Sequence, residues 1–241
     1  MQSVLEARPS MTMPPDTAPR KLTDDLHVFD ASFRLGGMDL GGRMTVIRLP
    51  DGGLWVHSPV AFTPERRAAV EALGPVRFLV APNLFHHVHL PDWAAAFPDA
   101  RVVAPAGLRA KQPALRIDQE LDDTPDPAWA QVLEQMHVRG MPRVNEFLFF
   151  HRPSRTLLLT DLAFHFQHAE SWALKLYLKA NRAWKRLAPT VLERLLMKDK
   201  EAVRASLQRA FKWDVERIVM CHGEVLERGG QKALHDAFSW L

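Results

Sequence analysis

Val76-Arg77-Phe78-Leu79-Val80-Ala81, followed by the histidine-rich Asn83-Leu84-Phe85-His86-His87-Val88-His89, decides the fold class of this chain. The first stretch is a short apolar run, which is typical of a buried strand. The second places three imidazoles directly after that strand, where open α/β sheets build their sites. Imidazole is the commonest metal ligand among side chains and titrates near neutral pH, so the pattern indicates a chemical site.

Two later segments repeat this arrangement, each with one metal-capable side chain after an apolar run. Leu157-Leu158-Leu159-Thr160-Asp161 ends in a carboxylate, and Ile218-Val219-Met220-Cys221-His222-Gly223 carries an imidazole near its end. Taken alone, Asp161 is equally typical of a helix cap and His222 of a turn. Their occurrence together with the first cluster, at three strand ends, favours one shared metal site.

Strands and helices alternate along the chain, which predicts an α/β (α+β) fold with helices outside a sheet. Strands are expected at residues 26–33, 43–49, 54–57, 76–81, 102–104, 132–138, 146–151, 155–160 and 215–220. Helices are expected at residues 66–73, 91–97, 106–111, 171–212 with a break at Pro189, and 231–240. A loop at residues 113–130 separates two mixed halves.

The composition fits a globular protein, because 47% of the 241 residues are hydrophobic and 24% are charged. A proline-rich mobile leader is expected at residues 1–23, before a single domain at residues 24–241. Cys221 is the only cysteine, which excludes an internal disulfide and favours a reducing compartment. No stretch approaches about 18 unbroken apolar residues, so we expect a cytoplasmic protein without a transmembrane segment.

Residues 170–212 carry a local excess of positive charge, with eleven Lys or Arg against four Asp or Glu. Because leucines recur there at helical spacing, the pattern is more typical of amphipathic helices with a solvated basic face. A nucleic-acid partner is not expected, and an anionic partner at 170–212 is the weaker alternative.

Three stretches carry a family resemblance: Arg43-Met44-Thr45-Val46-Ile47-Arg48-Leu49, Asp51-Gly52-Gly53-Leu54-Trp55-Val56-His57-Ser58-Pro59-Val60, and Ala81-Pro82-Asn83 with His86-His87. They resemble the DUF4336 family, a branch of the metallo-β-lactamase fold superfamily, and the resemblance extends from about residue 24 to the end. It implies a four-layer αββα sandwich with the site at the sheet edge. It implies no particular substrate.

The resemblance also implies that part of the superfamily's metal motif is replaced. That motif begins with His-x-His-x-Asp-His after a strand, and this chain has Pro82 and Leu84 at the first two histidines. A further histidine, found in a turn, is replaced by Met141. All three replaced positions would serve the first of two metals.

The positions around the second metal keep ligand-type side chains. His86 stands at the aspartate of the first motif and His87 at its last histidine, while Asp161 and His222 match the bridging aspartate and the terminal histidine. We therefore expect one divalent metal ion at His86, His87, Asp161 and His222, with Zn²⁺ favoured and Fe²⁺ or Mn²⁺ as alternatives. Adjacent residues of an extended segment point to opposite sides, and of the two neighbours His87 is preferred.

An open coordination position would let the metal activate water for attack on an ester, amide or phosphate. Glu146 is a candidate general base and Asn83 a candidate for orienting water or a carbonyl, although both also suit ordinary strand or turn positions. His89, His165 and His168 are candidates for further pocket residues. A Ser58 nucleophile would need a base within hydrogen-bond reach.

Two functions therefore stay open. The first is a mononuclear metal-dependent hydrolase, and the second is a degenerate, non-catalytic module that binds a ligand or partner on the same fold. The loss of ligands for the first metal favours the non-catalytic module. The complete set of ligand-type side chains around the second metal favours the hydrolase. Oligomeric state and substrate are not predicted.

Overall fold

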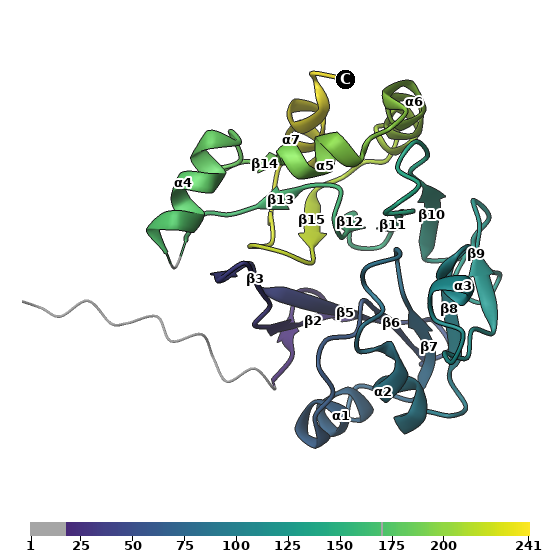
Figure 1. The fold of residues 1–241 in the computed structure, drawn as a ribbon. Helices are drawn as coiled ribbons and strands as arrows, with labels where there is room; N and C mark the ends of the chain where they lie inside the picture. The colour runs from purple at the N-terminus through teal and green to yellow at the C-terminus, as the bar shows by residue number, and fades with distance from the viewer. Residues whose placement is uncertain (1–17, 170) are drawn as a thin grey trace, which may run out of the picture.

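The computed structural model describes residues 18–169 and 171–241, and most of its strands form two sheets (Figure 1). The first sheet has seven strands in the order β1-β2-β5-β6-β7-β8-β9, with β6 to β9 parallel and the others antiparallel. These strands are β1 Arg20–Lys21, β2 Leu26–Ala31, β5 Gly42–Arg48, β6 Leu54–His57, β7 Val76–Val80, β8 Arg101–Pro105 and β9 Gln119–Leu121.

The second sheet has four strands in the order β10-β11-β12-β15. They are β10 Leu133–His137, β11 Phe147–His151, β12 Thr156–Leu159 and β15 Arg217–Met220. β12 and β15 are parallel and in register from Thr156 with Arg217 to Leu159 with Met220, so both strands end at the same edge.

Alternate side chains of these strands enter different cores, which explains why the strands are apolar on both faces. Trp55 and Phe78 of the first sheet join the core between the sheets, while their neighbours Val56 and Leu79 pack under the helices. Leu158 of the second sheet likewise lies between the sheets.

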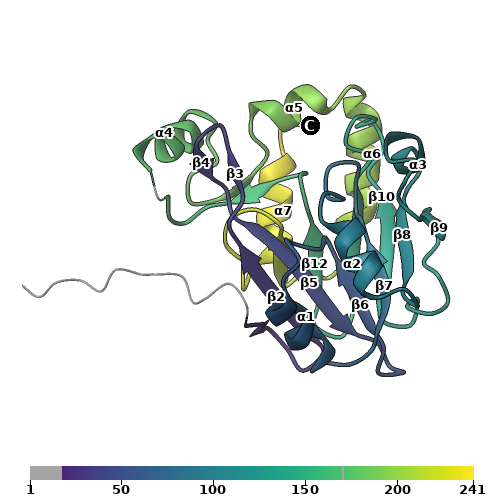
Figure 2. The same ribbon diagram turned by 60° about the horizontal axis from the view of Figure 1, so that its bottom comes forward.

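Helices cover the outer face of each sheet and complete a four-layer αββα sandwich (Figures 1 and 2). The first sheet is covered by α1 Pro64–Glu71, α2 Leu90–Ala96 and α3 Leu108–Lys111. The second is covered by α5 Val191–Leu196, α6 Lys200–Ala210 and α7 Gly230–Phe238. The predicted fold class is thereby confirmed.

A smaller unit stands beside the sandwich. It comprises helix α4 Trp172–Ala180, the hairpin of β3 Arg34–Leu35 and β4 Met38–Asp39, and the strand pair β13 Phe164–His165 and β14 Leu187–Ala188. Met38 and Leu40 pack against Leu178 of α4 in one small apolar cluster. Two-residue strands show no readable period, so the sequence predicted none of them.

Most predicted elements are present with ends shifted by a few residues, as hydrogen-bond geometry rather than hydropathy sets the ends. Two predictions were wrong in part: the loop at 113–130 contains β9, and the block at 171–212 contains β14 as well as helices. Pro189 does end a segment, between β14 and α5.

The predicted leader, residues 1–23, falls mostly on residues 1–17, which lie outside the described residues. Its last part includes β1, which pairs with β2. No helix in the described part of the chain combines the length and apolar character needed to cross a membrane. The single domain at 24–241 stays a prediction.

Candidate metal centre

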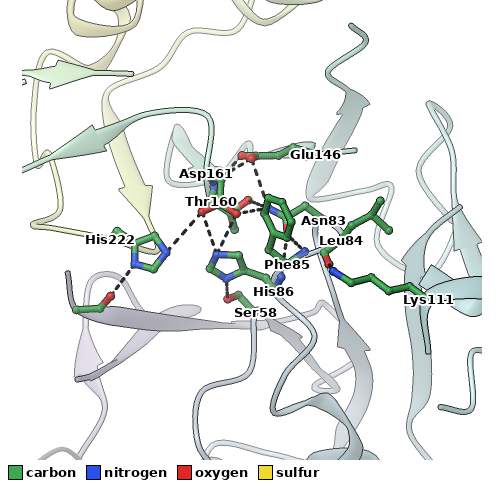
Figure 3. A network of polar contacts seen from close by, with 11 residues as sticks. Ser58, Asn83, Leu84, Phe85, His86, Lys111, Glu146, Thr160, Asp161 and His222 are labelled. Carbon is green, nitrogen blue, oxygen red and sulfur yellow. Dashed lines mark hydrogen bonds and ion pairs between the residues drawn. The ribbon is translucent and has the colours of Figure 1, made fainter. Parts of the chain in front are cut away.

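Four strands from the two sheets end at one edge of the sandwich and deliver polar side chains there. Ser58 follows β6, Asn83 and His86 follow β7, Asp161 comes two residues after β12, and His222 two residues after β15. Figure 3 shows these side chains converging around Asp161. The convergence follows from topology, because the parallel strands of each sheet end together.

His86, Asp161 and His222 form a compact group of possible metal ligands. One ligand atom from each lies within 4.8 Å of the other two. His86 Nε2 is 3.3 Å from Asp161 Oδ2, and His222 Nε2 is 3.6 Å from Asp161 Oδ1. The two distances run to different oxygens of the Asp161 carboxylate, and each is close to the spacing of two atoms bonded to one ion at about 2.0–2.2 Å.

The far nitrogen of each imidazole is held by a hydrogen bond. His222 Nδ1 lies 2.6 Å from the Gly41 carbonyl oxygen, which can only accept, so Nδ1 is the donor in this contact and Nε2 is the nitrogen that faces Asp161. His86 Nδ1 lies 2.7 Å from the Ser58 hydroxyl oxygen. Metal-binding histidines characteristically have such a partner, which fixes the ring and its tautomer.

Asn83 and Glu146 form hydrogen bonds with Asp161 and with the loop that carries His86. The Asn83 amide donates to Asp161 Oδ2 at 2.7 Å, and its Oδ1 accepts from the His86 backbone N–H at 2.8 Å. Glu146 accepts from the backbone N–H groups of Thr160 and Asp161 at 2.8 and 2.9 Å. Both side chains are fully buried, and neither lines the cavity described below. The structure thus places the two candidate catalytic residues behind Asp161, away from the cavity wall.

The charges of the group depend on one another. Burial alone would raise the pKa of Asp161, but the charges and hydrogen bonds of His86 and His222 outweigh burial and hold that pKa well below its usual range. Burial would lower the pKa of His86, but Asp161 raises it well above the ordinary value. Burial and then the Asp161 charge raise the pKa of Glu146. Metal-free protein therefore holds an Asp161 carboxylate beside a protonated His86.

His87 does not join this group, which corrects the preference for His87 over His86. Its Nε2 lies 3.1 Å from the Gln112 side-chain nitrogen, and its Nδ1 is buried without a partner. The physical reason is the loop after β7: two backbone N–H groups bond to Asn83 Oδ1 and turn His86, not its neighbour, toward Asp161.

The replaced half of the motif is packed with apolar side chains. Met141 is 1% exposed and lies in the core between the second sheet and its helices. Leu84 packs against the core under α2, and its backbone N–H donates to the Val144 carbonyl at 2.8 Å. The two segments therefore still meet, but without ligands.

The three candidate pocket histidines lie in different places. His89 lines the cavity in front of the metal group. His165 contacts the Glu224 carbonyl at 2.9 Å through Nδ1, and His168 contacts the Glu224 carboxylate at 3.1 Å. Neither His165 nor His168 lines that cavity.

A cavity of about 500 Å³ lies in front of His86, Asp161 and His222, all three of which line it. Its other walls include the β3–β4 hairpin, the start of β5, the loops after β6 and β7, β13, and helices α4 and α5. A volume in the range of small-molecule sites, about 300–1,000 Å³, leaves room for a ligand at the metal group.

Sequence reasoning missed two parts of this site. The Gly41 carbonyl is a backbone group that no residue pattern identifies as a partner of His222. Thr160 accepts from the Asn83 amide at 2.9 Å, and its place directly before Asp161 was the only available signal. Ser58 had been considered as a nucleophile, and the structure gives it His86 as a hydrogen-bond partner.

Comparison with known families gives one match. The sequence model of the family described as "Domain of unknown function (DUF4336)" matches residues 23–181, well over half of the chain. No curated protein matches the chain.

Solved structures with the metallo-β-lactamase fold are similar over most of the chain. A metallo-β-lactamase from Pontibacter korlensis has a TM-score of 0.65 at 14% identity, covering 92% of this chain and 96% of its own. A metal-soaked flavodiiron core from Synechocystis sp. has a TM-score of 0.69 at 12% identity, and the match covers 93% of this chain and 60% of that core. Rubredoxin oxygen:oxidoreductase from Desulfovibrio gigas has a TM-score of 0.68 at 12% identity, covering 92% and 61%. At such low identity the likeness shows the fold alone.

Proposed function

The chain belongs to the DUF4336 family and has the metallo-β-lactamase fold, and on that premise we propose that it is a hydrolase dependent on one divalent metal ion. The observation that carries the proposal is the position of His86, Asp161 and His222: three ligand atoms within 4.8 Å, on the wall of a cavity. The likeness to hydrolases and to oxygen-reducing proteins alike leaves the reaction to be argued from the site.

The donor set fits a metal ion. Two imidazole nitrogens and one carboxylate suit Zn²⁺, and also Fe²⁺ or Mn²⁺. Both imidazoles already have their Nδ1 atoms engaged by protein groups, so Nε2 is the nitrogen left for an ion. An ion held there would lower the pKa of water and polarise a carbonyl or phosphoryl group.

We assign the surrounding residues positioning roles. Ser58 fixes the ring of His86, and the Gly41 carbonyl fixes that of His222. Asn83 and Glu146 fix the carboxylate and backbone of Asp161. With three protein ligands and an open cavity, the site keeps a position for water or substrate, which is characteristic of catalytic rather than structural zinc.

The test compares metal-loaded wild type with two variants of matched exposure. The Asp161 and Asp126 side chains are 16% and 13% exposed, and only Asp161 lies in the metal group. Each protein is incubated with phenyl esters, lactones and bis(p-nitrophenyl) phosphate after loading with Zn²⁺, Fe²⁺ or Mn²⁺. We expect hydrolysis by wild type and Asp126→Ala but not by Asp161→Ala. Metal binding without hydrolysis of any substrate class would favour the non-catalytic alternative.

A cytoplasmic location is also a proposal. Cys221 is buried and free, which is compatible with a reducing compartment. The anionic partner of residues 170–212 stays a prediction.

A further inference from the structure

We propose that the substrate is an amphiphile: an ester or lactone whose alkyl or acyl chain occupies the cavity while its carbonyl faces His86, Asp161 and His222. This inference rests on the proposed function. Hydrolysis of an ester adds one water, whose oxygen bonds to the carbonyl carbon as the C–O bond to the leaving group breaks. The leaving oxygen takes a proton, so an acid and an alcohol result without any oxidant or reductant.

The first support is the apolar character of the cavity wall. The β3–β4 hairpin contributes Met38 and Leu40, helix α4 contributes Leu178, and α5 contributes Leu192 and Leu196. Phenylalanines from three further segments line the same space. Such a wall stabilises a bound chain by removing apolar surface from water, and offers it few hydrogen bonds.

The second support is that the polar groups on this wall, His89 apart, are already paired within the protein. Arg43 is the only Arg or Lys among the described residues that line the cavity, and its guanidinium bonds to Asp30 and to the Met220 carbonyl. Thr190 bonds to the Glu193 carboxylate. Because the only lysine or arginine side chain on the wall is already paired, the wall offers no free cation to an anionic group on the substrate.

The third support is the surface around the mouth of the cavity. Eight large apolar side chains are exposed among the described residues, and all lie on segments that frame the cavity. Four of them line the cavity itself: Phe33, Phe85, Val88 and Leu192. The other four, Trp172, Leu176, Val191 and Leu195, lie on α4 and α5 outside the cavity wall. Figure 2 shows the β3–β4 hairpin beside α4 at this side of the molecule. The clustering of the four lining residues at one opening marks a binding surface, because soluble proteins otherwise scatter such residues singly.

The experiment measures binding of 1-hexanol, 1-octanol and 1-decanol by calorimetry, with and without EDTA. These neutral probes have an alkyl chain and a polar head but undergo no hydrolysis. We expect affinity to rise about fourfold per methylene group in both conditions, as burial of each methylene predicts. An affinity independent of chain length would overturn the proposal.

Two variants on one helix give the matched control. Leu192 and Leu195 of α5 are 49% and 63% exposed, but only Leu192 lines the cavity. Leu192→Gln should weaken 1-decanol binding about tenfold, while Leu195→Gln should change it less than twofold. Equal loss in both variants would point to nonspecific surface binding and contradict the proposal.

The outcomes separate this inference from the proposed function. If alkanol affinity depends on chain length but the protein neither binds metal nor hydrolyses any substrate, the alkyl-binding site is supported and the proposed hydrolase function is contradicted. If hydrolysis is metal-dependent but alkanol affinity does not change with chain length, the hydrolase function is supported and the alkyl-binding site is contradicted. Flat affinities together with a dimeric protein in light scattering would assign the apolar face to a second copy of the chain.

Discussion

The retained and replaced halves of the metal motif lie on neighbouring segments but have opposite environments. In the retained half each ligand has a polar support: Ser58 for His86, the Gly41 carbonyl for His222, and Asn83 for Asp161. The replaced positions are Pro82, Leu84 and Met141: Leu84 and Met141 pack with apolar core side chains, and Pro82 is buried. Candidate ligands and the polar groups that support them are thus present together or replaced together, which supports our proposal of a site for one metal ion.

Replacing Asp161 by Ala should have the largest effect on metal binding. Asp161 faces both imidazoles, so its loss removes one ligand and the group that orients the charges of the others. We expect Zn²⁺ affinity to fall by more than about 100-fold, beyond what loss of a supporting residue costs. Titration with a competing chelator measures the change, and affinity within tenfold of wild type would place the ion elsewhere.

Glu146→Gln tests the support behind the ligand. A carboxylate accepts from both Thr160 and Asp161 N–H groups, whereas a glutamine has only one accepting oxygen. We expect Zn²⁺ affinity to fall about 10–100-fold. The control is Glu134→Gln, a half-buried glutamate that accepts from Arg152 and Trp213, lies outside the metal group and the cavity wall, and should leave affinity unchanged. Equal loss in both variants would indicate general destabilisation.

The pH dependence of metal binding follows from the pKa of His86. Because Asp161 raises that pKa well above 6.5, metal-free protein keeps the proton near neutral pH, and an incoming ion must displace it. Zn²⁺ affinity should therefore rise with pH, by about tenfold per unit while His86 is protonated. Calorimetry in buffers of different ionisation enthalpy should show release of about one proton. A pH-independent affinity would contradict this charge assignment.

Met141→His tests whether the replaced half can be restored one ligand at a time. Met141 is surrounded by core residues, and burying an imidazole there should cost about 1–3 kcal/mol of unfolding free energy. Metal stoichiometry should stay at one per chain, because Pro82 and Leu84 remain. Denaturant unfolding and elemental analysis check the two results. A second bound metal would mean that the replaced half is nearer to function than its packing indicates.

His87→Ala should have the smallest effect on metal binding. Its side chain contacts Gln112 and lies outside the metal group. We expect Zn²⁺ affinity within about twofold of wild type, below the cost of losing even a supporting residue. His86→Ala, the adjacent position, is the matched comparison and should lose most binding. The opposite order would restore the preference that the sequence suggested.

The sequence was most informative where strands are long and apolar. The runs ending at Ala81, Asp161 and His222 predicted three strand ends, and topology brings them to one edge. It failed where the direction of a side chain depends on a loop: the Asn83 hydrogen bonds decide between His86 and His87. The cavity could not be predicted from the sequence either, because its walls include two-residue strands and short helices that are far apart in the chain.

Native mass spectrometry of the protein titrated with Zn²⁺ tests the central claim most directly. We expect saturation at one ion per chain in wild type and in His87→Ala, and no bound ion in Asp161→Ala at the same free Zn²⁺ concentration. Saturation at two ions per chain, or at none, would contradict it.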